Sequence, residues 1–397
     1  MIKSLGKLAL LVLVAAISTA VAEDVQVKQH NLAYGITLRG GYDSNIYTAE
    51  KDVTGSFYTT IQPDFHAAWS SPSTDITLHY TYAATYYEKR PERHWDQAHN
   101  FSFNLAHEFS PRLRVTLYED FQPGFEPEIE SGIRQRQGNY IQNRVAVSSS
   151  YILGGRWTLP VTMSHYFISY DEGEAAESLN RQSWDAKVGV KYNATSRTTF
   201  YSDFSHGVNT YEGYNRSYTS ESLYFGVDHG LTPRLTVNAS AGVQMLSFDV
   251  KSNQEFNPLL SLKANYSLTS RTAMNLSFSS QVQPTEVTQY LVQYSWILSG
   301  GIVHQFTPKL MASVNLSYIP AEYNTDMALS AKDLDYKLEP SSQGGTETTL
   351  SSTIAVAYQF NLNLRAELGW SYIDVSSHFA NRTYSRHLTF LQGRLGF

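Results

Sequence analysis

The sequence predicts an all-β protein, a transmembrane antiparallel up-and-down β-barrel, and three observations support this fold class. Apolar and polar residues alternate along extended segments, which is the two-residue repeat of a β-strand. Short turns and longer polar stretches alternate between these segments, as in barrels of the bacterial outer membrane. An export signal precedes a chain that contains 28 Tyr, 19 Phe and no Cys.

The first 22 residues have the three parts of a cleaved signal peptide. Lys3 and Lys7 make the start positive, a short apolar run follows, and Ala20-Val21-Ala22 forms a cleavage site. The apolar run is too short to cross a bilayer as a helix, which needs about 20 residues. We therefore expect a signal peptide over 1–22 and one outer-membrane barrel domain over 23–397, in a Gram-negative bacterium.

Composition and motifs argue against several other classes. Without Cys, no disulfide framework can hold this exported chain together. The 30 basic and 36 acidic residues leave a mildly acidic chain, which does not favour nucleic acid as a partner. The 12 His include no H-x-x-x-H spacing, and no G-x-S-x-G motif appears. We expect no metal ion, no cofactor and no enzyme activity.

The alternation is clearest in three segments, 235–243, 310–318 and 362–372. Leu, Val, Ala, Tyr and Trp occupy one face of each segment, and polar or small residues occupy most of the other. Ordinary strands run about five or six residues, whereas a tilted strand that crosses a membrane needs about ten. The segments therefore predict membrane-spanning strands.

The connections predict how the strands are joined. Turns such as Ser110-Pro111-Arg112, Thr232-Pro233-Arg234 and Thr307-Pro308-Lys309 suit short hairpins, because Pro presets the turn and cannot continue a ladder. Longer polar stretches, including 122–137 and 323–344, lie between these turns. We count about eighteen strands, with about sixteen as the alternative. An even count puts both termini in the periplasm.

The two ends of the mature chain are expected to close the barrel by pairing 35–47 with 382–397. Leu391, Leu395 and Phe397 share one face of the last segment, and the final residue is aromatic. This pattern resembles the signal that the barrel assembly machinery recognises. We therefore expect that machinery and outer-membrane lipid as partners.

Alternation also assigns side chains to the lumen. The candidates for solute selection are Arg39, Asp43, Asn45, Arg365, Glu367, Arg386 and Arg394. They form either a weakly basic strip that biases which solutes pass, or ion pairs across strands that merely keep the wall wet. A barrel this wide with no plug domain should leave an opening, narrowed by a loop.

Tyrosines also fall on the inferred inner face, at Tyr58, Tyr87, Tyr118, Tyr166, Tyr201 and Tyr224. Their rings could stack on sugars, with the hydroxyl as a hydrogen-bonding group. The alternative is structural, because Tyr and Trp form girdles at both interfaces of such barrels. A slip of one residue in the register would move every one of them to the lipid side.

Gly40 to Asn45 includes an Asp-x-Asn spacing, which calcium loops also use. A calcium loop needs a bidentate Glu at position twelve, and counting from Asp43 reaches Thr54 instead. We therefore expect Asp43 and Asn45 to lie on the lumen face of a strand that reaches the outer rim. Asp64 and His66 share a face, and this pair supports the least favoured alternative, an outer-membrane hydrolase.

At Gly41-Tyr42-Asp43-Ser44-Asn45 the chain resembles the second outer-membrane "putative β-barrel porin" family. Its members are often encoded within exopolysaccharide gene clusters, so the resemblance implies a role in polysaccharide export. The main expectation is a passive, porin-like channel, with polysaccharide as a candidate solute. The rival is a structural or adhesive barrel whose loops at 122–137 and 323–344 bind partners.

Overall fold

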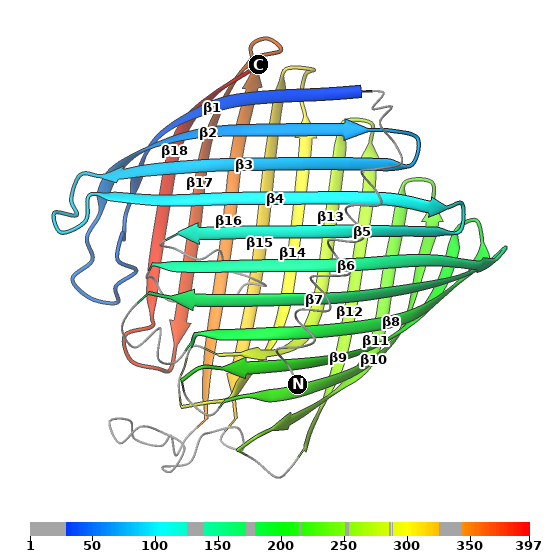
Figure 1. The fold of residues 1–397 in the computed structure, drawn as a ribbon. Coiled ribbons are helices and arrows are strands. Elements are labelled where there is room, and N and C mark those ends of the chain that lie inside the picture. Colours follow the sequence, from blue (N-terminus) through cyan, green and yellow to red (C-terminus); the bar gives the residue numbers. More distant parts are fainter. Residues whose placement is uncertain are drawn as a thin grey trace.

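The computed structural model describes residues 29–124, 139–171, 179–213, 216–250, 254–285, 287, 289–324 and 344–397. These residues form one 18-stranded antiparallel sheet in which each strand pairs with the next along the chain. The first strand, β1, also pairs with the last, β18, so the sheet closes into a barrel (Figure 1). The predicted barrel of eighteen strands is confirmed, and the alternative of sixteen is wrong. The predicted signal peptide lies outside the described residues.

The strands are long, from 12 residues in β5 to 16 in β4 and β12. Their bounds are β1 Gln29–Asp43, β2 Ser56–Ser70, β3 Thr74–Tyr87, β4 Trp95–Ser110, β5 Leu113–Gly124, β6 Tyr140–Gly154, β7 Trp157–Tyr170, β8 Arg181–Thr195, β9 Thr198–Tyr211, β10 Tyr218–Thr232, β11 Leu235–Phe248, β12 Gln254–Thr269, β13 Thr272–Pro284, β14 Val292–Gln305, β15 Leu310–Tyr323, β16 Gly345–Gln359, β17 Leu364–Ser377 and β18 Tyr384–Gly396. No helix among the described residues is long and apolar enough to cross a membrane.

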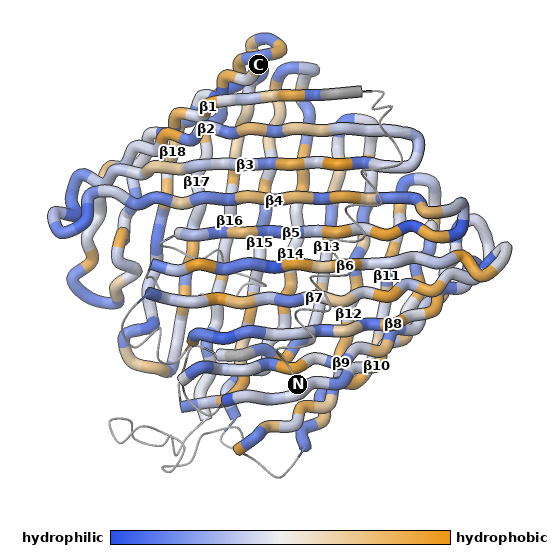
Figure 2. The backbone as a smooth tube through the Cα atoms, viewed as in Figure 1, coloured by the Kyte–Doolittle hydropathy of each residue, from blue (hydrophilic) through white to orange (hydrophobic). Residues whose placement is uncertain are grey.

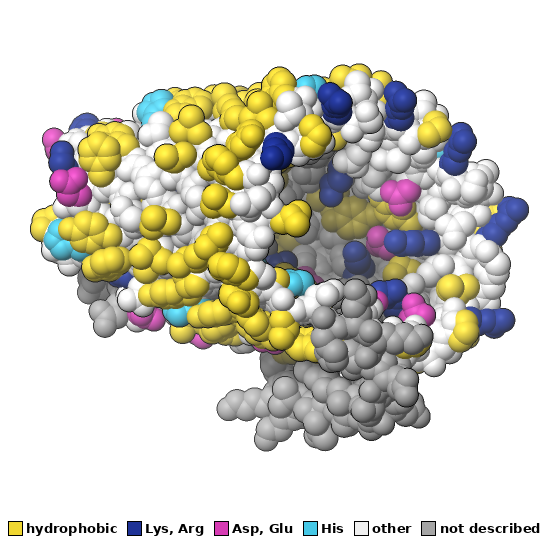
Figure 3. Space-filling model, turned by 90° about the horizontal axis from the view of Figure 1, so that it is seen from above, with side chains coloured by type: hydrophobic (Ala, Val, Ile, Leu, Met, Phe, Trp, Pro, Cys, Tyr) yellow, Lys and Arg dark blue, Asp and Glu magenta, His cyan; other side chains and the backbone are white. Residues whose placement is uncertain are grey.

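Apolar side chains cover the outer wall of the barrel. Hydrophobic and hydrophilic residues alternate along the strands (Figure 2), and hydrophobic side chains spread over the outside (Figure 3). Leu38 of β1, Leu316 of β15 and Leu368 of β17 all point outward with more than half of their surface exposed. Water would disfavour such a surface, whereas lipid accepts it. The outward face predicted for these strands is confirmed.

The predicted short turns join successive strands at one end of the barrel. In the β10–β11 hairpin, Thr232 Oγ1 accepts hydrogen bonds from the backbone N–H of Arg234 (3.2 Å) and Leu235 (3.0 Å). The β14–β15 hairpin has the same arrangement around Thr307. A hydroxyl that satisfies two turn amides explains why Ser or Thr opens these turns. The carboxyl end of the chain lies at this end, because Gly396 N–H bonds to the β16–β17 turn at Asn363.

The seam between β1 and β18 has the predicted partners but different limits. Its ladder runs from Gly35 opposite Gly396 to Asp43 opposite Leu388. The first strand begins earlier than expected, at Gln29, and ends at Asp43. Asn45 therefore lies beyond the strand, where the chain turns away from the ladder.

Candidate functional site

The lumen carries charged side chains on the four strands around the seam, β17, β18, β1 and β2. Figure 3 shows an opening into the barrel that is bordered by Lys and Arg side chains, with acidic side chains inside it. Arg365 Nη2 lies 2.6 Å from Glu367 Oε2, and Arg394 Nη2 lies 2.6 Å from Asp64 Oδ1. These predicted lumen cations therefore form ion pairs, which leaves little of the predicted basic strip.

Arg39 differs from these cations. Its Nε donates to Gln392 Oε1 at 2.8 Å, and its guanidinium carbon lies 4.7 Å from the centre of the Phe390 ring. None of the described carboxylates forms an ion pair with it. Among the predicted selectivity cations, Arg39 thus keeps its charge available to a solute.

Asp43 and Arg386 form a buried ion pair at the outer end of the seam. Arg386 Nε lies 3.0 Å from both carboxylate oxygens of Asp43, and Nη2 lies 2.5 Å from Oδ2. Asp43 has no exposed surface, and Arg386 is 7% exposed. The structure places both residues where they hold strands together and where a passing solute does not reach them.

Asn45 organises the turn that follows β1. Its amide nitrogen donates to the carbonyls of Ala49 (2.9 Å) and Ser385 (3.2 Å), and its Oδ1 accepts from Ala49 N–H. Its own backbone N–H donates to Asp43 Oδ1 at 3.0 Å. The Asp-x-Asn spacing is thus an Asx turn that caps the strand. The described residues contain no group of three or more acidic or His side chains that could hold a metal ion.

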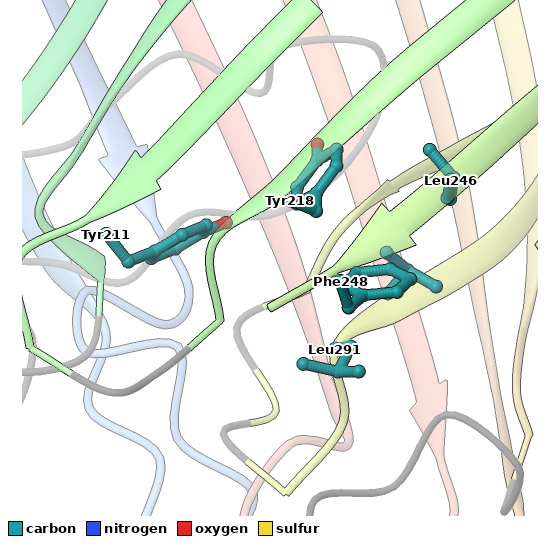
Figure 4. Packing of buried hydrophobic residues seen from close by; sticks show 6 residues of the cluster. Tyr211, Tyr218, Leu246, Phe248 and Leu291 are labelled. Atoms are coloured by element: carbon teal, nitrogen blue, oxygen red, sulfur yellow. The ribbon is translucent and has the colours of Figure 1, made fainter. Parts of the chain in front are cut away.

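The described residues between β13 and β14, which are 285, 287 and 289–291, pack against lumen-facing side chains at the outer mouth. We call these residues the mouth segment. Tyr290 has no exposed surface, and its ring lies 5.5 Å from that of Tyr323 and 5.7 Å from that of Phe379. Leu291 packs beside Phe248 in a second cluster (Figure 4). The mouth segment therefore packs against side chains of the barrel wall.

The sequence carries a signal for the packing of the mouth segment. The available signal was composition, because Val287, Tyr290 and Leu291 are apolar residues in a connection that should be polar. All three are at most 6% exposed in the structure. Apolar residues in an outer connection need another surface to cover them, and the lumen wall provides it.

The predicted inner tyrosines have mixed environments. Tyr58 and Tyr87 are buried with Ile46, a residue of the β1–β2 connection, so they pack the mouth and cannot stack on a solute. Tyr201 accepts a hydrogen bond from Asn238 Nδ2 at 3.0 Å. Tyr118 remains 39% exposed, and its hydroxyl lies 3.3 Å from Asp120 Oδ2. Of these four, Tyr118 is the best placed to meet a solute.

An uncharged row of serines crosses the four neighbouring strands β13 to β16, which precede β17 and the seam. Ser277 of β13 is opposite Ser299 of β14, which is opposite Ser317 of β15, which is opposite Ser351 of β16. The first two hydroxyls lie 2.6 Å apart. The row faces the lumen, because its sequence neighbours such as Leu316 point outward. It presents donors and acceptors with no net charge.

Asp64 and His66, the pair that suggested a hydrolase, each contact a different residue. Asp64 accepts from Arg394, and the His66 ring lies 6.4 Å from that of His79. Neither contact couples the carboxylate to the imidazole, as an acid–base pair would require.

Comparison with known proteins supports the fold. No protein-family model matches this sequence, and no curated protein matches it. A crystal structure of Pseudomonas aeruginosa OccK2 (OpdF) matches with a TM-score of 0.50 at 10% identity, covering 92% of this chain and 98% of that chain. OccK2 in complex with glucuronate matches with a TM-score of 0.50 at 11% identity and the same coverage. The P. aeruginosa outer membrane protein OpdK gives 0.46 at 11% identity, covering 92% and 99%.

At these identities the likeness to OccK2 bears on the fold alone. It agrees with the closed barrel that the strand pairing of this chain shows. By its fold and its surface, this chain is a β-barrel of the bacterial outer membrane.

Proposed function

We propose that this chain is a passive, porin-like channel for small hydrophilic solutes. The observation that carries the proposal is a closed barrel of 18 strands with a polar inner face. Side chains fill a barrel of about eight strands, whereas about sixteen to eighteen strands leave an aqueous channel. A solute can therefore cross by diffusion, without a moving part that does work.

The lining supports weak selection by charge and stronger selection by size. Arg365 and Arg394 are paired with acids, which removes most of the basic strip near the seam. Arg39 of β1 is a positive group that remains available, and the exposed Lys187 and Lys191 lie on a distant part of the wall, in β8. We expect the mouth segment to limit the size of the solutes that pass, because it packs on the inner side of the wall at the outer mouth.

Passage of a polysaccharide is the second candidate. The serine row from Ser277 to Ser351 favours it, because hydroxyls can exchange hydrogen bonds along a sugar chain without trapping it by charge. The resemblance to the exopolysaccharide-associated family also supports it, although no family model matches. A polymer chain would require the mouth segment to move aside.

Planar-bilayer recording tests the channel. The purified protein should conduct, and the variant Tyr290→Ser with Leu291→Ser should raise the single-channel conductance by about two-fold, because it loosens the packing of the mouth segment. Val53→Ser, in the exposed β1–β2 connection, is the control and should leave conductance unchanged.

Liposome swelling with sugars of increasing length separates the two candidates. A cut-off at small sugars supports the diffusion channel, and entry of long oligosaccharides supports the polymer route. Folded protein that conducts nothing would instead favour the structural or adhesive barrel. The two loops proposed for that role, 122–137 and 323–344, lie largely outside the described residues.

A further inference from the structure

Arg216 joins two connections at the outer mouth. It lies in the β9–β10 connection, just before β10, and its side chain has no exposed surface. Its Nη2 donates to the carbonyl oxygens of Thr285 (2.6 Å) and Leu291 (3.4 Å). These carbonyls belong to the two ends of the mouth segment. Arg216 therefore holds the segment against the wall of the barrel.

The other donors of this guanidinium have no acceptor. Arginine has five N–H bonds, of which two are on Nη2. Nε and both hydrogens of Nη1 are buried without a hydrogen-bond partner. The hydroxyl of Tyr211, whose ring centre lies 5.1 Å from the guanidinium carbon, is also buried without a partner. Buried donors without an acceptor cost free energy. An acceptor that binds to these donors would therefore stabilise the folded state.

The guanidinium of Arg216 lies over the face of the Tyr211 ring, but no described carboxylate offsets its charge. None of the described Asp or Glu side chains forms an ion pair with it. Burial lowers the pKa of Arg216; the neighbouring Tyr211 opposes this shift, and repulsion from Arg181 adds to it. A buried cation without a counterion is unstable, so an anion bound here would offset the cost of burial.

We propose that Arg216 and Tyr211 form a binding site for a small monocarboxylate at the outer mouth. A carboxylate offers several acceptor positions, which the donors of Arg216 and the Tyr211 hydroxyl can satisfy. A single negative charge neutralises Arg216. Tyr218, Phe248 and Leu291 line the same cluster (Figure 4), so the apolar part of the anion would be sheltered from water.

Entry to the site depends on the mouth segment. Since Arg216 has no exposed surface, the anion reaches it only when the segment moves away from the wall. A carboxylate also competes with the two carbonyls for Nη2. The inference rests on the proposed channel function only for the route by which the anion arrives, since binding itself requires no transport.

Thermal unfolding in detergent at pH 7 tests the site, followed by circular dichroism. A ligand that binds only the folded state raises the unfolding temperature. Sodium butyrate should therefore raise it more than sodium chloride at the same ionic strength. Arg216→Met should abolish the difference. Lys263→Met, which removes an exposed lumen cation elsewhere, should retain it.

Tyr211→Phe removes one hydroxyl and should weaken butyrate binding about ten-fold, the value of one hydrogen bond to a charged group. This variant decides the matter if Arg216→Met does not fold. Equal responses to butyrate and chloride, an unchanged response in Arg216→Met, or an unchanged affinity in Tyr211→Phe would each overturn the site. If the protein conducts but does not respond to butyrate, the binding site is wrong and the channel function stands. If it responds to butyrate but does not conduct, the channel function is wrong and the binding site stands.

Discussion

Asp43 and Arg386 show how a residue that looks like a binding group can be structural. Both side chains are buried at the seam, and the carboxylate is engaged by Nε and Nη2 of the guanidinium. Placing an ion pair away from water is costly, but each partner satisfies the other. Removal of one partner leaves a buried charge with nothing to offset it.

We therefore predict that Asp43→Asn lowers the free energy of unfolding by about 3 kcal/mol. Urea unfolding in lipid vesicles measures the change. Asp52→Asn is the control, because Asp52 is an exposed loop residue with a φ of 54°, which Asn also tolerates. Combining Asp43→Asn with Arg386→Gln should recover part of the loss. Equal stability of Asp43→Asn and the control would show that the pair does not hold the seam.

At the scale of one strand, Gly40 and Gly41 have opposite requirements although they are adjacent. A Cβ on Gly41 would overlap the carbonyl oxygen of Thr389 across the seam and the ring of Tyr58. A Cβ on Gly40 would meet no atom within 4 Å. The strand alternates faces, so Gly41 faces the crowded lumen wall and Gly40 faces outward.

Gly41→Ala should destabilise the barrel by about 1–3 kcal/mol, because the neighbouring backbone cannot move away cheaply. Gly40→Ala should change stability by at most about 0.5 kcal/mol. The temperature at which the folded band disappears on a gel gives the comparison. Similar losses in both variants would mean that the contact with Thr389 does not limit the site.

At the scale of the whole molecule, Phe397 is the point where the chain closes on itself. Its backbone N–H and carbonyl both bond to Tyr34, at 2.8 Å and 3.1 Å. The two rings stack with centres 5.3 Å apart. Phe397 remains 55% exposed on the outer wall, as do Leu391 and, less so, Leu395. The predicted assembly signal is therefore accessible from outside the barrel.

We predict that Phe397→Ser lowers the amount of barrel assembled in the outer membrane of cells several-fold, while refolding into vesicles is nearly unchanged. Phe360→Ser is the control, because Phe360 is also an exposed aromatic residue beside a short turn. Fractionated membranes and folded-band intensity provide the measurement. Equal loss in cells and in vesicles would indicate that Phe397 acts through packing on Tyr34 and not through recognition.

Local pattern predicted most of the fold. The alternation at 310–318 and 362–372 depends on successive residues alone, and so do the strands and the faces of Leu316 and Leu368. The turn at Thr232 is local as well, because its hydroxyl bonds only two and three residues ahead. The prediction is wrong at Asn45, which was expected in the first strand, because β1 ends at Asp43 and a turn follows.

The sequence by itself determined a barrel and the two faces of its wall, because a two-residue repeat is visible without knowledge of distant partners. It left eighteen or sixteen strands open, and the strand pairing decided for eighteen. Only the tertiary structure decided which charged side chains form ion pairs. Asp43 pairs with Arg386, 343 positions later, and Asp64 pairs with Arg394, 330 positions later. The tertiary structure also decided that the mouth segment packs against the wall and that Arg216 is buried beside it. Such contacts depend on closure of the ring, which brings together residues whose separation along the chain carries no periodic signal.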